Sequence, residues 1–185
     1  CNDLEYVQTV TVIDETAPEL TVPADATVEC DAVPAVGEAT ATDNCDTDVE
    51  VTYDGEARVD GFCEDTYTLT RTWTATDNCG NETTLSQTIN VQDTTKPELT
   101  IPADATVECD AIPKTGVATA TDNCDADVSI QYLGEKKSPG DCENNYTLIR
   151  IWRATDNCGN VTIKSQVLTV QDTTAPELTI PADVT

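Results

Sequence analysis

The chain of 185 residues contains no histidine and no methionine, and it has only one Phe, two Trp and five Tyr. Without an imidazole it has no catalytic base for an ordinary Ser or Cys hydrolase. A structural zinc site would need histidines or CxxC-type cysteine pairs, and the sequence has neither. No apolar run approaches the roughly 20 residues that a membrane-spanning helix requires.

Positive charge is equally scarce. Nine Lys and Arg stand against 35 Asp and Glu, which gives a formal net charge of −26. A surface of this kind repels nucleic acid, which is therefore excluded as a partner. Carboxylates are hard oxygen ligands that suit calcium. The alternative is an acidic surface that binds nothing and only keeps the protein soluble.

The residues that are abundant indicate strands in an oxidising compartment. Val, Thr, Ile and Tyr carry the hydrophobic pattern, and these types favour β-strands. Nine cysteines in such a chain indicate disulfides and an extracellular location. The sequence begins in the middle of a pattern, so the lack of a signal peptide does not bear on export.

The sequence repeats with a period of 79 residues, and 51 of the 79 positions are identical between the two copies. The linker phrase that begins Asp14-Glu-Thr-Ala-Pro returns at Asp93 and again at Asp172. Near-identical tandem copies suit a stalk or a multivalent binder better than an enzyme. We expect the tail of a preceding repeat at 1–13, complete repeats at 14–92 and 93–171, and the start of a following repeat at 172–185.

Each repeat contains short strand signals bounded by turn residues. In the first repeat they lie at 20–23, 27–30, 49–53, 66–77 and 83–92, and no stretch shows helical periodicity. The pattern predicts an all-β fold of tandem immunoglobulin-like antiparallel β-sandwiches, disulfide-stapled and arranged as a rod.

The phrase ATDNC occurs twice in each repeat, at 41–45, 75–79, 120–124 and 154–158. In an immunoglobulin-like sandwich both phrases fall in loops at the end where the chain enters. We therefore expect the two loops of a repeat to be neighbours beside the entry linker.

This placement constrains the cysteines. Cys63 and Cys79 flank an extended strand and lie some 35–50 Å apart at about 3.3 Å per residue, too far for a bond. We prefer a bond that staples the two loops at the entry end and a second bond towards the other end of the sandwich. The alternative of Cys30 with Cys79 would require opposite ends to meet. The predicted pairs are Cys30–Cys63, Cys45–Cys79, Cys109–Cys142 and Cys124–Cys158.

The same loops and linkers gather oxygen-bearing side chains that could hold a calcium ion. So many like charges at one point would repel without a cation. The alternative is turn chemistry, in which Asp and Asn bond their own backbone. The candidate metal ligands are Asp14, Glu19, Asp43, Asn44, Asp46, Asp48, Asp77, Asn78 and Asn81 in the first repeat, and Asp93, Glu98, Asp122, Asn123, Asp125, Asp127, Asp156, Asn157 and Asn160 in the second.

The phrases D-x-T-x-P-E-L-T-x-P-A-D-A-T-V-E-C, T-A-T-D-N-C and W-x-A-T-D-N-C-G-N resemble hyalin-repeat (HYR-like) domains, which are immunoglobulin- and cadherin-like. Such domains occur in tandem in large secreted surface adhesins of Bacteroidetes, including gliding-motility adhesins exported by type IX secretion. The resemblance covers the whole chain, although its cysteine placement departs from the common pattern. It implies calcium at Asp14, Asp43, Asp77 and their copies, and O-glycosylation at Thr94 and Thr173.

We therefore interpret the chain as a non-enzymatic structural stalk of an extracellular, cell-surface adhesin or filament. Its expected partners are neighbouring repeats of the same chain, with surface glycans or proteins bound by domains outside this window, and no membrane insertion is expected. One alternative is a module that itself binds a glycan or protein. Another is a non-catalytic spacer in a secreted multidomain enzyme.

Overall fold

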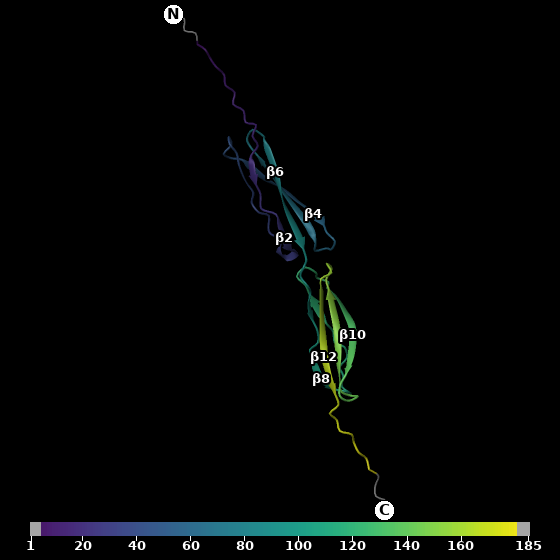
Figure 1. Ribbon diagram of the computed structural model, residues 1–185. Coiled ribbons are helices and arrows are strands. Elements are labelled where there is room, and N and C mark those ends of the chain that lie inside the picture. Colours follow the sequence, from purple (N-terminus) through teal and green to yellow (C-terminus); the bar gives the residue numbers. More distant parts are fainter. Residues whose placement is uncertain (1–4, 181–185) are drawn as a thin grey trace, which may run out of the picture. The chain divides into compact units, whose positions relative to one another are not determined.

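A computed structural model describes residues 5–180, so Cys1 lies outside the described part of the chain. The chain divides into two compact units, Cys1–Gln92 and Asp93–Thr185. Each unit is built from strands, as Figure 1 shows. The prediction of an all-β, immunoglobulin-like fold is confirmed. Among the described residues, no helix is long and apolar enough to cross a membrane.

The described part of the first unit, residues 5–92, contains six strands and one short 3-10 turn. Three of the strands are long and lie side by side, and the others have only three or four residues. In chain order the elements are β1 Glu19–Thr21, β2 Ala26–Glu29, η1 Cys30–Ala32, β3 Thr40–Thr42, β4 Glu50–Asp60, β5 Tyr67–Thr76 and β6 Glu82–Gln92.

The second unit repeats this arrangement of strands. Its elements are β7 Glu98–Thr100, β8 Ala105–Glu108, β9 Thr119–Thr121, β10 Ser129–Pro139, β11 Tyr146–Thr155 and β12 Val161–Gln171.

Each unit has one large and one small sheet. The large sheet has the order β2-β6-β5-β4 in the first unit and β10-β11-β12-β8 in the second, and the small sheets are β1-β3 and β7-β9. All strand pairs are antiparallel except β2 with β6 and β8 with β12, which are parallel. In each large sheet, the strand that comes first in the chain, β2 or β8, therefore lies directly beside the strand that comes last, β6 or β12.

The core lies on one face of the long strands. Along β5, the side chains of Leu69, Arg71, Trp73 and Ala75 are buried, whereas the alternating threonines are partly exposed. One apolar cluster contains Leu20, Trp73 and Ala75, and a second contains Leu69, Ile89 and Val91. Period-two alternation thus directs one set of side chains inward in each repeat.

Arg71 lies in this inward row between residues of the two apolar clusters, and it is 4% exposed. Its Nε donates to Glu56 at 2.7 Å, and its terminal nitrogens donate to the carbonyls of Ala35 and Pro34 at 3.1 and 2.9 Å. Arg150 has the equivalent partners Glu135, Lys114 and Pro113. The arginine therefore holds a loop of irregular backbone against the sheet.

The structure contradicts one predicted disulfide in each unit, and the pairs Cys30–Cys63 and Cys124–Cys158 stay predictions. Cys30, Cys63, Cys124 and Cys158 are disulfide-bonded, whereas Cys45, Cys79, Cys109 and Cys142 are free thiols. The predicted Cys45–Cys79 and Cys109–Cys142 bonds are therefore not formed. Burial first, and then nearby aspartates, raise the thiol pKa of Cys45, Cys79 and Cys109.

The free and bonded cysteines are related by the 79-residue repeat. Cys45 and Cys79 correspond to the bonded Cys124 and Cys158, and Cys109 and Cys142 correspond to the bonded Cys30 and Cys63. Each kind of cysteine is thus bonded in one unit and reduced in the other.

Candidate metal site

The aspartate of each ATDNC phrase folds its own loop. In the first unit, Asp43 Oδ1 accepts hydrogen bonds from the backbone N–H of Cys45 at 2.9 Å and of Asp46 at 3.0 Å. Asp77 Oδ1 accepts from Cys79 at 2.9 Å and Asn81 at 2.8 Å. This is the turn chemistry expected of aspartate. It uses one oxygen of Asp43, whereas the second oxygen of Asp77 accepts from the Asn81 side-chain amide at 2.8 Å.

Asp46 connects the two loops. This side chain is 7% exposed. Its Oδ1 accepts from the backbone of Asp48 at 2.9 Å and its Oδ2 from the backbone of Asn78 at 2.9 Å. Asp125 does the same with Asp127 and Asn157 in the second unit. The two loops of a unit are therefore neighbours, although 32 residues separate Asp46 from Asn78.

The entry linker is bonded to the second of these loops and to the strand that follows it. The Asn81 amide donates to the Asp14 carbonyl at 3.3 Å, and the Thr83 hydroxyl donates to the Pro18 carbonyl at 2.6 Å. In the second unit, Asn160 donates to the Asp93 carbonyl at 3.2 Å. Thr83 was not among the predicted site residues, since a threonine in a Thr-rich strand gives no signal of such a contact.

Three carboxylates converge where the linker meets the loops. One oxygen each from Asp14, Asp43 and Asp77 lie within 4.8 Å of one another. The Oδ2 atoms of Asp14 and Asp43 are shielded from solvent and have no hydrogen-bond partner. Shielded carboxylate oxygens this close together repel unless a cation or a proton compensates them.

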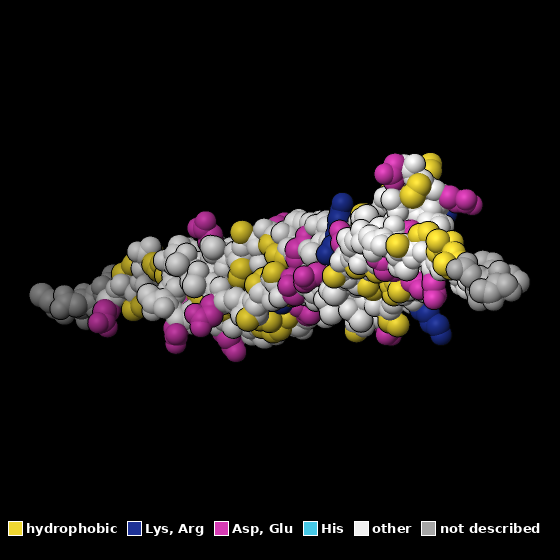
Figure 2. Space-filling model, turned by 90° about the horizontal axis from the view of Figure 1, so that it is seen from below, with side chains coloured by type: hydrophobic (Ala, Val, Ile, Leu, Met, Phe, Trp, Pro, Cys, Tyr) yellow, Lys and Arg dark blue, Asp and Glu magenta, His cyan; other side chains and the backbone are white. Residues whose placement is uncertain are grey.

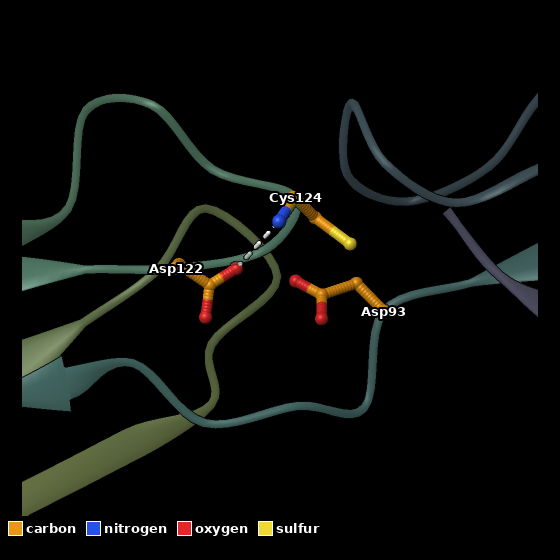
Figure 3. Close-up of side chains that lie close together, drawn as sticks. All are labelled: Asp93, Asp122 and Cys124. Atoms are coloured by element: carbon orange, nitrogen blue, oxygen red, sulfur yellow. Dashed lines mark hydrogen bonds between the residues drawn. The ribbon is translucent and has the colours of Figure 1, made fainter. Parts of the chain in front are cut away.

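The second unit presents a related group. Asp93, Asp122 and Cys124 each offer one atom within 4.8 Å of the others, and the two carboxylates point toward one another in Figure 3. Cys124 is disulfide-bonded, so its sulfur is not a thiolate ligand. The Oδ2 atoms of Asp122 and Asp156 are shielded and lack hydrogen-bond partners, as in the first unit for Asp14 and Asp43.

In the first unit, hydrogen bonds keep Asp43 and Asp77 ionised. Backbone donors from Cys45 and Asp46 lower the pKa of Asp43. Burial opposes ionisation of Asp77, but hydrogen bonds from Asn81, Cys79 and Gly80 outweigh it, so the pKa of Asp77 also lies below its ordinary value. Both groups are therefore anionic at neutral pH.

The structure separates the predicted ligands into three sets. Asp14, Asp43 and Asp77 are brought together, and so are Asp93 and Asp122. Both oxygens of Asp46 and Asp125 accept backbone hydrogen bonds, which gives these residues a structural part. The remaining acidic candidates lie outside the two carboxylate groups: Glu19, Asp48, Glu98, Asp127 and Asp156. The asparagine candidates are Asn44, Asn78, Asn81, Asn123, Asn157 and Asn160, of which Asn81 donates to Asp77 Oδ2 at 2.8 Å.

The residues present fit a calcium ion. Calcium prefers oxygen ligands, and the carboxylates of Asp14, Asp43 and Asp77 supply them. Hydrogen bonding has not used the Oδ2 atoms of Asp14 and Asp43. An ion held there would neutralise the repulsion among the carboxylates. Because Asp14 belongs to the linker, the ion would also join the linker to both loops.

The wider surface is acidic as well. The space-filling view shows Asp and Glu side chains spread over the visible face (Figure 2). The two repeats differ, however: 14–92 contains 18 Asp and Glu against 2 Lys and Arg, a net charge of −16, whereas 93–171 contains 12 against 7, a net charge of −5.

Residues 18–91 match the family model described as "HYR-like domain with 4 cysteines". The match covers less than half of the chain and falls within the first repeat. It agrees with the resemblance drawn from the sequence phrases. The HYR-like segment returns as 97–170, displaced by 79 residues. None of the curated proteins matches the chain.

Several solved cadherin structures are similar in fold. Drosophila N-cadherin EC1-4 shares 13% identity, with a TM-score of 0.36, over 85% of this chain and 50% of that one. The human desmocollin-1 ectodomain shares 14%, with a TM-score of 0.34, over 88% and 43%. Human mucin-like protocadherin EC1-2 shares 16%, with a TM-score of 0.33, over 83% and 98%. The chain thus spans half or less of the first two, and similarity at this level does not bear on function.

Proposed function

We propose that this chain is a non-catalytic segment of an extracellular bacterial surface adhesin or filament, in which tandem HYR-like domains form a stalk that holds other domains away from the cell. The domain boundaries predicted from the repeat, at 14–92 and 93–171, describe its units. The near identity of the two copies and the HYR-like match support this proposal.

The observation that carries it is the bonding of the linkers. The linkers at Asp14 and Asp93 are hydrogen-bonded to the domain that follows. The equivalent phrase at Asp172 is bonded to the domain that precedes it: Thr173 donates to Glu108 through its hydroxyl at 2.6 Å and its backbone N–H at 3.1 Å, and Asp172 receives a bond from Asn144. A linker phrase that can bond on both sides limits bending, as a spacer requires.

We further propose that calcium binds at Asp14, Asp43 and Asp77 and at the copies of these residues. The converging carboxylates and their unpartnered shielded oxygens support this assignment. Ion binding would strengthen the connection of the linker to its domain. O-glycosylation of Thr94 and Thr173 stays a prediction; both residues are exposed, and the Thr173 hydroxyl already donates to Glu108.

Calcium-dependent unfolding of the chain tests this proposal. At a free calcium concentration about 100 times the Kd, the free energy of unfolding should rise by about 2.7 kcal/mol for each site, and EDTA should reverse the change. Asp43→Asn with Asp77→Asn should abolish the effect in the first unit, because Asn keeps a turn-forming oxygen but removes the charge.

Asp31→Asn is the matched control, since Asp31 is an exposed aspartate in η1, outside the carboxylate group. It should respond to calcium as the parent does. Small-angle scattering with calcium and with EDTA reports the flexibility of the linkers. Equal melting temperatures and equal scattering in the two conditions would overturn the calcium proposal.

A further inference from the structure

The outward faces of the two large sheets differ far more than their inward faces. On strands β5 and β6, the inward positions carry the same residue as their counterparts on β11 and β12 at eight of ten places. The outward positions are identical at only four of eleven. The core is thus retained between the repeats while one surface has changed.

In the first unit this surface is hydroxylic and acidic. We call it the threonine face. Thr74 hydrogen-bonds with Thr84 at 2.9 Å, and Thr72 with Ser86 at 3.1 Å. Asp54 accepts from Thr74, and Glu50 and Glu82 flank Thr76 across the strands. The threonine face comprises Glu50, Thr52, Asp54, Thr68, Thr70, Thr72, Thr74, Thr76, Glu82, Thr84, Ser86 and Thr88.

In the second unit the equivalent surface is aliphatic and basic. We call it the isoleucine face. Ile149, Ile151, Ile163 and Val167 replace four threonines, and Ile149 lies directly opposite Val167 across the strands. Leu133 and Val161 replace Asp54 and Glu82. Leu133 and Ile163 are 47% and 58% exposed.

Two cations lie on the isoleucine face. Arg153 replaces Thr74, and Lys136, opposite Ile149 in the register, replaces Ala57. Neither takes part in an ion pair with another described residue, although the chain carries 35 acidic residues. Unpaired cations among exposed aliphatic side chains indicate a surface suited to an acidic partner.

We propose that the isoleucine face binds the threonine face of a second copy of this chain. The two faces have the same three-stranded form, and their charges are opposite: Arg153 and Lys136 on one, Glu50, Asp54 and Glu82 on the other. Threonine methyl groups give the aliphatic residues apolar area to pack on. Sheets pack face to face at about 10 Å.

The contact joins two different surfaces, so it is heterologous and can extend from one copy to the next. Each molecule that binds through its isoleucine face still offers a threonine face to another. Three strands of about ten residues give a footprint of roughly 33 by 14 Å. This is smaller than the approximately 800 Å² per partner of a standard interface, so we expect weak association, with a Kd above about 10 μM for one contact.

Sedimentation of the 185-residue chain from micromolar to about 1 mM tests this contact. The buffer has an ionic strength of about 0.15 M and contains EDTA, because calcium could bridge acidic copies non-specifically. Without calcium, the result does not depend on whether the calcium proposal is correct. The parent should show a mass that rises with concentration.

The informative variant carries I149T, I151T, R153T and V167T together. These are the residues of the first repeat at the same places, so the fold tolerates them, and the variant should associate at least tenfold more weakly. E50S with E82V, which places second-repeat residues on the threonine face, should also weaken association. V117E is the control: Val117 is 88% exposed, lies outside the isoleucine face and is Glu38 in the first repeat.

V117E should match the parent within about twofold. A parent that stays monomeric over the whole range would overturn the proposal. The proposal would also be overturned if the variant with all four substitutions associated as strongly as the parent.

Discussion

At the scale of single residues, aspartate has two separate parts in each unit. Asp43 folds its loop with one oxygen and leaves the other shielded and unpartnered. Both carboxylate oxygens of Asp46, three positions later, accept hydrogen bonds from backbone N–H groups, one in each of the two loops. The sequence predicts that both belong to one cluster but cannot assign these parts, because both aspartates belong to the same acidic phrase. The assignment depends on which N–H groups the fold brings within reach.

Arg71 is the buried charge whose loss should matter most for stability. Its guanidinium donates hydrogen bonds to Glu56 and to two carbonyls of the loop that packs against the sheet. We expect Arg71→Met to lower the free energy of unfolding by about 3 kcal/mol, measured by urea denaturation, because it leaves these acceptors unpaired. Arg58→Met should change it by less than about 1 kcal/mol, since the Arg58 side chain is 45% exposed. Equal effects of the two substitutions would contradict this assignment.

At the scale of elements, the long strands are predictable and the short ones are not. The alternation of buried and exposed residues in β5 is visible in the sequence from Tyr67 onward. The strand β3 was not predicted, because three residues pair with the distant β1 and show no period of their own. The strand β4 extends to Asp60, beyond the predicted end at residue 53, since its polar residues lie at the exposed edge of the sheet.

The parallel pairs also escaped prediction. Ala26 pairs with Ile89, and no local pattern connects segments that are 63 residues apart.

The cysteine pairs give a prediction at this scale. Cys45 and Cys79 are free in the first unit, although the equivalent cysteines of the second unit are bonded. Mild oxidation should join Cys45 to Cys79 and Cys109 to Cys142, the pairs predicted from the sequence, because the equivalent cysteines of the sister repeat are disulfide-bonded. Peptide mapping before and after oxidation checks this. The reaction should accelerate with rising pH, since the raised thiol pKa limits the thiolate. A bridge from Cys45 to Cys109 would contradict it.

At the scale of the whole molecule, charge sets the conditions under which the protein is stable. The chain carries a net charge of −26, concentrated in the first repeat. Self-repulsion of this size opposes the compact state and is reduced by salt or by bound cations. Surroundings rich in salt therefore suit this protein.

The acid limb of stability follows from Asp43 and Asp77. Their folded pKa values are lowered, so the unfolded chain binds more protons at low pH. The stability that they contribute is fully present above their unfolded pKa, near pH 4, and is lost as the pH falls through their folded pKa. Thermal unfolding in EDTA from pH 7 to pH 2 should show this loss. It should be smaller in the variant with Asp43→Asn and Asp77→Asn, and an unchanged pH profile would argue against it.

The parallel pairing of β2 with β6 has a mechanical consequence. β2 lies near the point where the chain enters the unit, and β6 ends where it leaves. Tension applied at the two ends pulls these neighbouring strands in opposite directions along their length. The interstrand hydrogen bonds, which run across the strands, are then sheared together rather than opened one at a time. β8 and β12 repeat this geometry in the second unit. Each domain therefore resists stretching through its one parallel strand pair, β2 with β6 or β8 with β12.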